Sequence, residues 1–332
     1  MTVDVIGGPA SWKGSAIGAT WLHEVDDAQR AELVRLARDV TAALGERTEA
    51  QLPTIERSSL TMPALAPMLD SLHTALTVGE GFALVRGLPV DDLDEFQNVV
   101  MYWCLSLQLG VPIHQNLQRA MIIHVRDQGK DYAQLGVRSY ETAAQLEYHS
   151  DSSDVVGLYC LRPARIGGTS TIVSSVAIHD EIVRRRPDLA PLLYEPWPQA
   201  NPLDSTVTWK PVCARNDAGQ LFTKYGRLYM ETAWKHDASV ARLDHRRREL
   251  LDLYDELANS TEFLLDMSFQ AGDAQFLNNF VTMHSRTEYA DWPEPERARE
   301  LLRMWLVLPE GLDVPPVFED SGFVPRNVAF GR

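Results

Sequence analysis

The sequence predicts a mainly β protein with flanking helices, whose core is a double-stranded β-helix (a jelly roll, cupin-like). Helical periodicity fills the first third of the chain, and short extended segments separated by turn residues follow from Gly110 onward. The 332 residues suffice to bury a sizeable core, and neither a linker nor a repeat divides them. We therefore expect one domain over 1–332, with a helical buttress and first strand (1–110), a jelly-roll core (111–310) and a C-terminal tail (311–332).

Helices are predicted where apolar residues recur at three- and four-residue spacing. Residues 26–44 show this spacing, and Gly45 after them is a helix stop. The acidic run 91–95 indicates a helix that continues to Leu109, because negative charge is favourable at a helix N-terminus. Further helices are predicted over 63–76, 177–185 and 238–259.

Strands are predicted where short apolar or alternating segments lie between glycine, proline and other turn residues. The first is an apolar run within 79–89, bracketed by glycines and a proline. Later strands are predicted over 120–126, 143–151, 155–161, 169–175, 206–215, 220–224, 263–269, 274–286 and 301–308.

Composition excludes several classes of partner. The net charge of −15 disfavours binding to nucleic acid or to anionic membranes, which relies on clustered Lys and Arg. No apolar run approaches the roughly 18 to 20 residues that span a bilayer, and the N-terminus lacks a secretory pattern. The three cysteines form no CxxC pair, which argues against a zinc knuckle and a disulfide scaffold. We therefore expect a cytoplasmic protein that binds neither nucleic acid nor membrane.

His149 and Asp151 lie two residues apart at the end of a predicted strand. Side chains alternate along a strand, so the imidazole and the carboxylate point to the same side. Two such ligands make half of a first-row metal site, and the third has to come from another strand. The strongest candidate for this third ligand is His284 in the strand 274–286, where it shares a face with Phe276. The alternative is a buried histidine beside a surface aspartate.

Two arginines follow on the last predicted strand. If residues 299–305 are extended, Arg299, Arg303 and Trp305 share a face. Arginines aimed inward are costly unless they meet an anion or carboxylates, and a planar guanidinium is well suited to grip a carboxylate. The alternative is a helix end with both arginines solvated.

Together these segments resemble the taurine dioxygenase family, part of the clavaminate synthase-like group of iron(II)- and 2-oxoglutarate-dependent oxygenases. The resemblance covers roughly residues 60 to 308 and rests on the order and spacing of the motifs. The motifs are His149-Ser150-Asp151, Gly167-Gly168-Thr169-Ser170, His284-Ser285-Arg286-Thr287, Arg299-Glu300-Leu301-Leu302-Arg303, the Gly272-Asp273 turn and the Gly-Phe-x-Leu-x-Arg-Gly stretch 81–87.

The resemblance implies that His149, Asp151 and His284 bind Fe(II), leaving open positions for oxygen chemistry. It implies 2-oxoglutarate as co-substrate, O2 as oxidant, hydroxylation of an unactivated C–H bond of a small molecule, and release of succinate and CO2. Related halogenases lack the carboxylate ligand, so Asp151 argues against halogenation. Desaturation and ring closure stay open.

The resemblance also implies a site for 2-oxoglutarate. Arg299 matches the arginine that pairs with the distal carboxylate, and Arg303 matches its neighbour further along the strand. Ser170 takes the position of the threonine in the family's Gly-Gly-x-Thr, keeping the hydroxyl and losing the methyl. Thr169 is adjacent but faces the other way if the strand is regular, so Ser170 is preferred.

The substrate itself is not predicted. Gln145 and Glu147 share the parity of His149 and are expected to line the same cavity, although each is more often structural or solvated. The loop-rich stretch before them, where this family often places substrate contacts, adds Arg138, Tyr140, Gln115 and Asn116.

Two other functions would use the same residues. One is a zinc-dependent hydrolase with the His/Asp/His site, and the other is a non-catalytic jelly-roll binding protein with packed histidines. We predict the oxygenase because the motifs occur together and in the family's order. Self-association into a homo-oligomer is left open.

Overall fold

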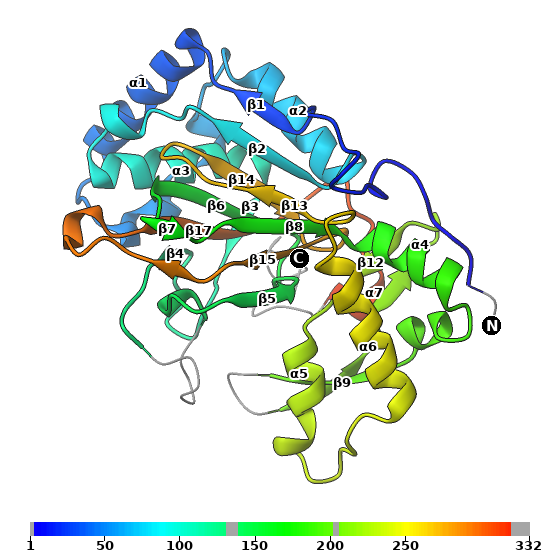
Figure 1. The fold of residues 1–332 in the computed structure, drawn as a ribbon. Coiled ribbons are helices and arrows are strands. Elements are labelled where there is room, and N and C mark those ends of the chain that lie inside the picture. Colours follow the sequence, from blue (N-terminus) through cyan, green and yellow to red (C-terminus); the bar gives the residue numbers. More distant parts are fainter. Residues whose placement is uncertain (1–2, 131–138, 202–205, 320–332) are drawn as a thin grey trace.

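Two sheets face each other in the computed structural model, which describes residues 3–130, 139–201 and 206–319 (Figure 1). The seven-stranded sheet has the order β1-β2-β14-β6-β17-β3, with β4 paired to β17, and the four-stranded sheet has the order β13-β8-β15-β5. The large sheet comprises β1 (Leu22–Glu24), β2 (Phe82–Arg86), β3 (Val111–Ile113), β4 (Ile122–Val125), β6 (Val155–Arg162), β14 (Ala274–Asn278) and β17 (Glu300–Val307). The small sheet comprises β5 (Leu146–His149), β8 (Ser170–Ser174), β13 (Leu265–Met267) and β15 (Thr282–Arg286).

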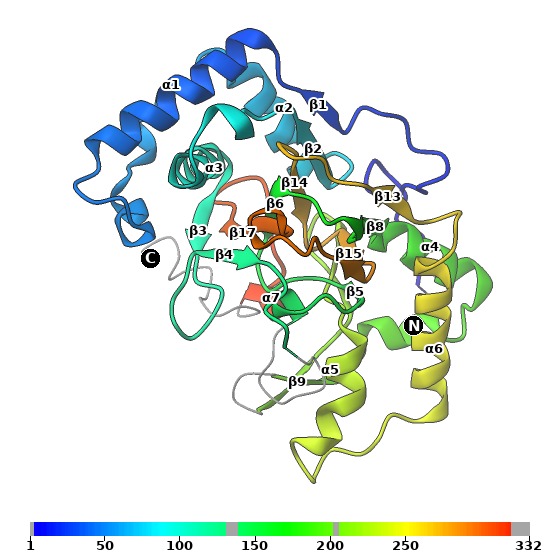
Figure 2. The ribbon, with the colours of Figure 1, turned by 60° about the vertical axis from the view of Figure 1, so that its left-hand side comes forward.

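Three helices cover the outer face of the large sheet: α1 (Asp27–Ala43), α2 (Ala66–Thr77) and α3 (Glu95–Leu109) (Figures 1 and 2). α1 and α3 each begin with a capping box, Asp26 with Gln29 and Asp94 with Gln97, which satisfies the first free N–H groups of the helix. Every second residue of β17 points to these helices, where Leu302, Met304 and Leu306 join their apolar core. The other face of the large sheet is thereby left for the interior.

A second helical layer lies on the far side of the small sheet. α4 (Ser175–Arg185) packs on β8 and β15, and α6 (His245–Ala258) packs on α4 (Figure 2). Val173 and Met283 turn outward into this apolar core. The remaining α-helices are α5 (Arg227–Thr232) and α7 (Pro316–Glu319), and the remaining strands form three antiparallel pairs: β7 (Ile166–Gly167) with β16 (Tyr289–Ala290), β9 (Trp197–Ala200) with β10 (Val207–Lys210), and β11 (Cys213–Arg215) with β12 (Leu221–Thr223).

The predicted jelly roll with flanking helices is confirmed, but one predicted strand was wrong. Residues 274–286 form two strands, β14 in the large sheet and β15 in the small sheet, joined by a turn. Phe276 therefore packs outward against Tyr102 of α3, while His284 faces the interior. Several other predictions had misplaced bounds: the strand 206–215 is divided into β10 and β11, and the helices predicted to start at 63, 91 and 238 begin at Ala66, Glu95 and His245.

One ion pair joins two motifs that are far apart in sequence. Arg86, at the end of β2, donates from Nε and Nη2 to the two carboxylate oxygens of Asp273 at 2.9 and 2.8 Å. Asp273 is fully buried, and Gly272 before it has φ +87, which favours glycine. The pair holds the turn that leads into β14.

None of the helices within the described ranges is long and apolar enough to cross a membrane.

Candidate active site

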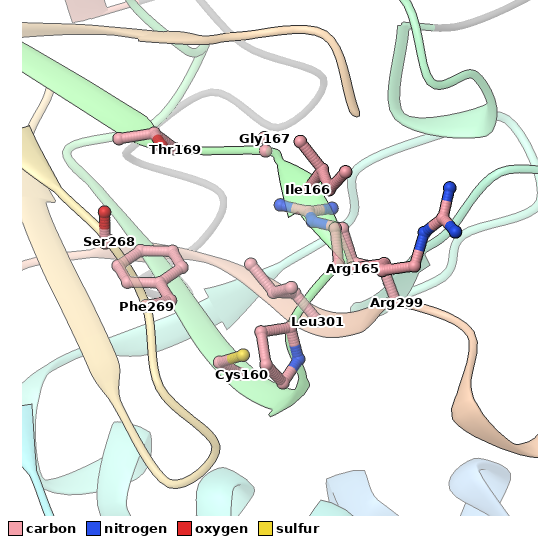
Figure 3. A pocket seen from close by; sticks show the side chains of 12 residues that line it. Cys160, Arg165, Ile166, Gly167, Thr169, Ser268, Phe269, Arg299 and Leu301 are labelled. Atoms are coloured by element: carbon pink, nitrogen blue, oxygen red, sulfur yellow. The ribbon is translucent and has the colours of Figure 1, made fainter. Parts of the chain in front are cut away.

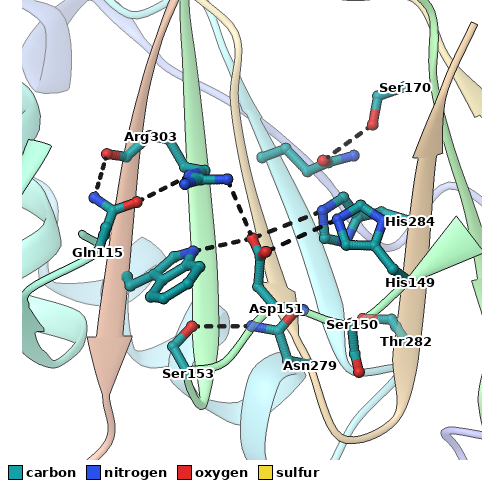
Figure 4. A network of polar contacts seen from close by, with 12 residues as sticks. Gln115, His149, Ser150, Asp151, Ser153, Ser170, Asn279, Thr282, His284 and Arg303 are labelled. Carbon is teal, nitrogen blue, oxygen red and sulfur yellow. Dashed lines mark hydrogen bonds and ion pairs between the residues drawn. The ribbon is translucent and has the colours of Figure 1, made fainter. Parts of the chain in front are cut away.

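Three side chains that can bind a metal ion meet between the two sheets (Figure 4). His149 ends β5, Asp151 follows it, and His284 lies on β15, where it is registered opposite His149. The two imidazole centroids are 4.3 Å apart, and Nε2 of each ring lies 3.8 Å from a carboxylate oxygen of Asp151. One ligand atom from each residue lies within 4.8 Å of the others. The structure thus brings together the three residues predicted as ligands.

Neighbouring groups hold these ligands in place. Nδ1 of His149 lies 2.9 Å from the carbonyl oxygen of Glu147, and donating to it leaves Nε2 available for a metal. Asp151 accepts a hydrogen bond of 3.0 Å from Nε1 of Trp305, and its own N–H donates to Oδ1 of Asn279 at 3.0 Å. Trp305 belongs to the large sheet and Asn279 to the turn between β14 and β15, so Asp151 is held from two directions.

The charge states of the cluster suit metal binding. Burial raises the pKa of Asp151, but the charges of Arg303, His284 and His149 outweigh it and hold that pKa below its usual range. Burial and the neighbouring His149 lower the pKa of His284 to about 3. At neutral pH the carboxylate is therefore ionised and His284 is neutral, as metal ligands must be. Two imidazoles and one carboxylate are the donor set of non-haem Fe(II) oxygenases, so these residues fit a ferrous ion.

Arg303 lies on β17 directly beside the cluster. Its Nη1 is 3.8 Å from Oδ2 of Asp151, and its Nε donates to Oε1 of Gln115 at 2.9 Å. Gln115 in turn donates to the carbonyl oxygen of Arg303 at 2.9 Å. The guanidinium carbon is 5.1 Å from the ring centroid of Tyr140 and 5.1 Å from that of Trp305. Tyr140 and Gln115, both predicted near the substrate, therefore lie around Arg303.

Arg299 lines a cavity of about 230 Å³ (Figure 3). It precedes β17 and is only 4% exposed. Gly168 has φ +70, and a Cβ at that position would lie 3.1 Å from Nε of Arg299, so the glycine permits a close backbone approach. The lining residues are Cys160, Pro163, Ala164, Arg165, Ile166, Gly167, Gly168, Thr169, Ser268, Phe269, Arg299 and Leu301.

The other residues predicted around the site differ in burial and in whether they line the cavity. Ser170 is buried, and its hydroxyl donates to Oε1 of Gln275 at 3.2 Å, whereas Thr169 lines the cavity. Gln145 and Glu147 are exposed, and a register shift between β5 and β15 interrupts the strict alternation used to place them. Arg138 lies outside the described residues. The roles of all these residues stay predictions.

Sequence reasoning missed the partners of the cluster. Trp305 was placed on the face of Arg303, but strand alternation does not indicate which residue of another sheet its indole will meet. The contacts of Asn279 and Gln275 could not be predicted from the sequence, because an isolated amide in an apolar run does not indicate a specific partner.

A family comparison identifies the chain. Residues 47–305 match the model of the taurine catabolism dioxygenase TauD, TfdA family. The chain belongs to this family. As a TauD/TfdA protein it is an oxygenase that depends on Fe(II) and 2-oxoglutarate, and His149, Asp151 and His284 all lie within the matched residues.

Individual relatives agree with the family. FR-33289 synthase from Streptomyces rubellomurinus is 25% identical over 324 residues, which cover 93% of this chain and 92% of that protein. Taurine hydroxylase-like protein SAT17 from Stachybotrys chartarum is 28% identical over 258 residues, covering 73% of this chain and 65% of that protein.

Solved structures show the same fold. An asparagine oxygenase in complex with Fe(II), 2S,3S-3-hydroxyasparagine and succinate has a TM-score of 0.66 at 17% identity, covering 87% of this chain and 93% of its own. The non-haem iron oxygenase OrfP in complex with Fe and α-ketoglutaric acid has a TM-score of 0.66 at 16% identity, covering 87% and 94%.

Proposed function

We propose that His149, Asp151 and His284 hold Fe(II) and that the enzyme hydroxylates a C–H bond of a small molecule, using O2 and releasing succinate and CO2 from 2-oxoglutarate. The observation that carries this proposal is the convergence of three ligand atoms within 4.8 Å between the sheets. Fe(II), when bound, would supply the centre at which O2 is activated, and 2-oxoglutarate and the substrate C–H bond would supply the electrons that reduce it. The family match favours this function over the zinc hydrolase and the non-catalytic binding protein.

The remaining site residues bind and orient the co-substrate. Arg299 is proposed to pair with the distal carboxylate of 2-oxoglutarate in the cavity that it lines, where Leu301 and Phe269 supply apolar walls. Arg303 is proposed to bind 2-oxoglutarate together with Arg299, from the side of Asp151. The charge of Arg303 also keeps the Asp151 carboxylate ionised. The Ser170 hydroxyl can serve the co-substrate after turning away from Gln275.

The substrate is proposed to be a small polar molecule. Two structurally similar oxygenases hold hydroxyasparagine and, for OrfP, L-Arg. Tyr140 beside Arg303 supports a substrate approach from that side, and Arg138, Gln145 and Glu147 remain proposed contacts. The three cysteines are unpaired and buried, which supports a reducing cytoplasm. A homo-oligomer also remains a proposal, which analytical ultracentrifugation would decide.

Anaerobic spectroscopy tests the function. Adding Fe(II) and 2-oxoglutarate to the protein should produce a weak visible charge-transfer band, which is absent in His149→Ala. His245→Ala removes an exposed histidine on α6 and serves as the control with an unchanged band. Absence of the band in the wild type, with no succinate formed from any of a broad panel of small molecules, would contradict the proposed function.

A further inference from the structure

Arg286 is a buried arginine to which no role was assigned. It lies on β15 two residues after His284, so both side chains face the interior. It is registered opposite Ser170 and is only 7% exposed. A buried guanidinium requires partners, because desolvating an unpaired charge is costly.

One set of partners belongs to the loop that leads into the metal site. Nη2 of Arg286 donates to the carbonyl oxygen of Thr142 at 2.9 Å and to that of Ala144. These residues directly precede β5, which ends in His149. Arg286 therefore ties this loop, through its backbone, to the strand that carries His284.

The other neighbour is a second arginine. The guanidinium carbon of Arg286 lies 5.0 Å from the ring centroid of Tyr289, and that of Arg299 lies 4.8 Å from the same centroid. Within the part of the chain that the structure describes, no carboxylate forms an ion pair with either arginine, and Nε of Arg286 is buried without a hydrogen-bond partner. Burial and the charge of Arg299 lower the pKa of Arg286 to about 10, although Tyr289 and the carboxylate of Asp127 oppose this shift, so a further anion beside the two arginines is favourable.

We infer that Arg286 is a positioning residue for 2-oxoglutarate: it holds the loop at Thr142 and Ala144 and adds a second positive charge to the place where Arg299 meets the distal carboxylate. This inference rests on the proposed function. It makes the co-substrate pocket selective for 2-oxo acids with a second carboxylate, because only these compensate both arginines.

Binding of two 2-oxo acids separates this role from a structural one. The Kd of 2-oxoglutarate and of 2-oxovalerate, which lacks the distal carboxylate, is measured by calorimetry on the Mn(II)-loaded protein. We expect Arg286→Gln to raise the Kd of 2-oxoglutarate about tenfold or more, as for loss of one charge contact, and to leave that of 2-oxovalerate unchanged. Arg286→Lys, which keeps the charge, should recover part of the loss.

The control is Arg215→Gln. Arg215 also donates to a main-chain carbonyl far away in sequence, that of Asp4 at 2.7 Å. Its replacement should leave both Kd values unchanged. Hydrogen exchange gives a second readout: 2-oxoglutarate should protect residues 140–149 in the wild type and not in Arg286→Gln. An equal effect of Arg286→Gln on both acids, or no effect, would overturn the inference. A wild type that binds no 2-oxoglutarate would overturn the proposed function itself.

Discussion

Nε1 of Trp305 donates a hydrogen bond of 3.0 Å to Oδ2 of Asp151 and thereby joins the large sheet to the metal-binding cluster. Trp305→Phe keeps an aromatic ring, although a smaller one, and removes the donor. We expect an Fe(II) affinity lower by roughly 10- to 100-fold, the usual effect of losing a partner of a metal ligand. Titration with Fe(II) under anaerobic conditions measures it. Trp234→Phe, whose ring lies under Arg242 at 4.1 Å, is the control, and equal affinities of the two variants would contradict the role of Trp305.

Gly168 is expected to be required for the co-substrate pocket. Gly168→Ala strains a backbone with φ +70 and places a Cβ 3.1 Å from Nε of Arg299. Gly129→Ala is a matched control, because it has φ +68 and no atom within 4 Å of the added Cβ. Both variants should lose about 1 kcal/mol of stability. Only Gly168→Ala should raise the KM for 2-oxoglutarate; a parallel rise in both would refute the contact with Arg299.

Arg299→Ala should weaken the binding of 2-oxoglutarate, while Fe(II) still binds. Removing one partner of a buried charge pair costs about 2 kcal/mol or more, which corresponds to a KM raised roughly 30-fold or more. Arg215→Ala is the control, because Arg215 is exposed and does not line the cavity. Steady-state kinetics with varied 2-oxoglutarate measures this KM, and an unchanged KM in Arg299→Ala would move the role to Arg303 or to another residue.

His124 should make stability depend on pH. Hydrogen bonds to Glu300 and Glu49, at 2.5 and 2.7 Å, raise the pKa of His124 from 6.5 to about 9. Because the folded pKa is raised, this stabilisation is complete below pH 6.5 and is lost as the pH rises through 9. The difference in free energy of unfolding between wild type and His124→Ala should therefore shrink across that range. His245→Ala, in an exposed position, should show no such trend, and a constant difference for His124 would contradict the prediction.

The fold could be predicted from local periodicity and turn residues. The one large error in that prediction came from a turn that was not recognised. Alternation and turn residues identify strands but not the sheet that each strand joins, so a continuous apolar run over 274–286 was interpreted as one strand. The turn at 279–281 moves the chain from one sheet to the other. The structure still brings His284 to His149 and Asp151, because β15 carries it to the interior whichever way Phe276 faces.

That His149, Asp151, His284 and Arg303 lie close together could be predicted from the sequence. Imidazoles, carboxylates and inward arginines are few and costly to bury, so their spacing is informative. The contacts that position them are not: Gln115 reaches Arg303 from a loop, and Trp305 reaches Asp151 across the interior. Such contacts depend on how the two sheets are placed, which no single segment specifies.

The bidentate ion pair between Arg86 and Asp273 has an evolutionary consequence. Replacing Arg86 alone would leave the buried Asp273 carboxylate without its ion-pair partner, whereas the Arg86 side chain, which is 30% exposed, can still reach water if Asp273 is replaced. Across homologous enzymes, a lineage that loses the arginine at position 86 should therefore have lost the aspartate at position 273 as well.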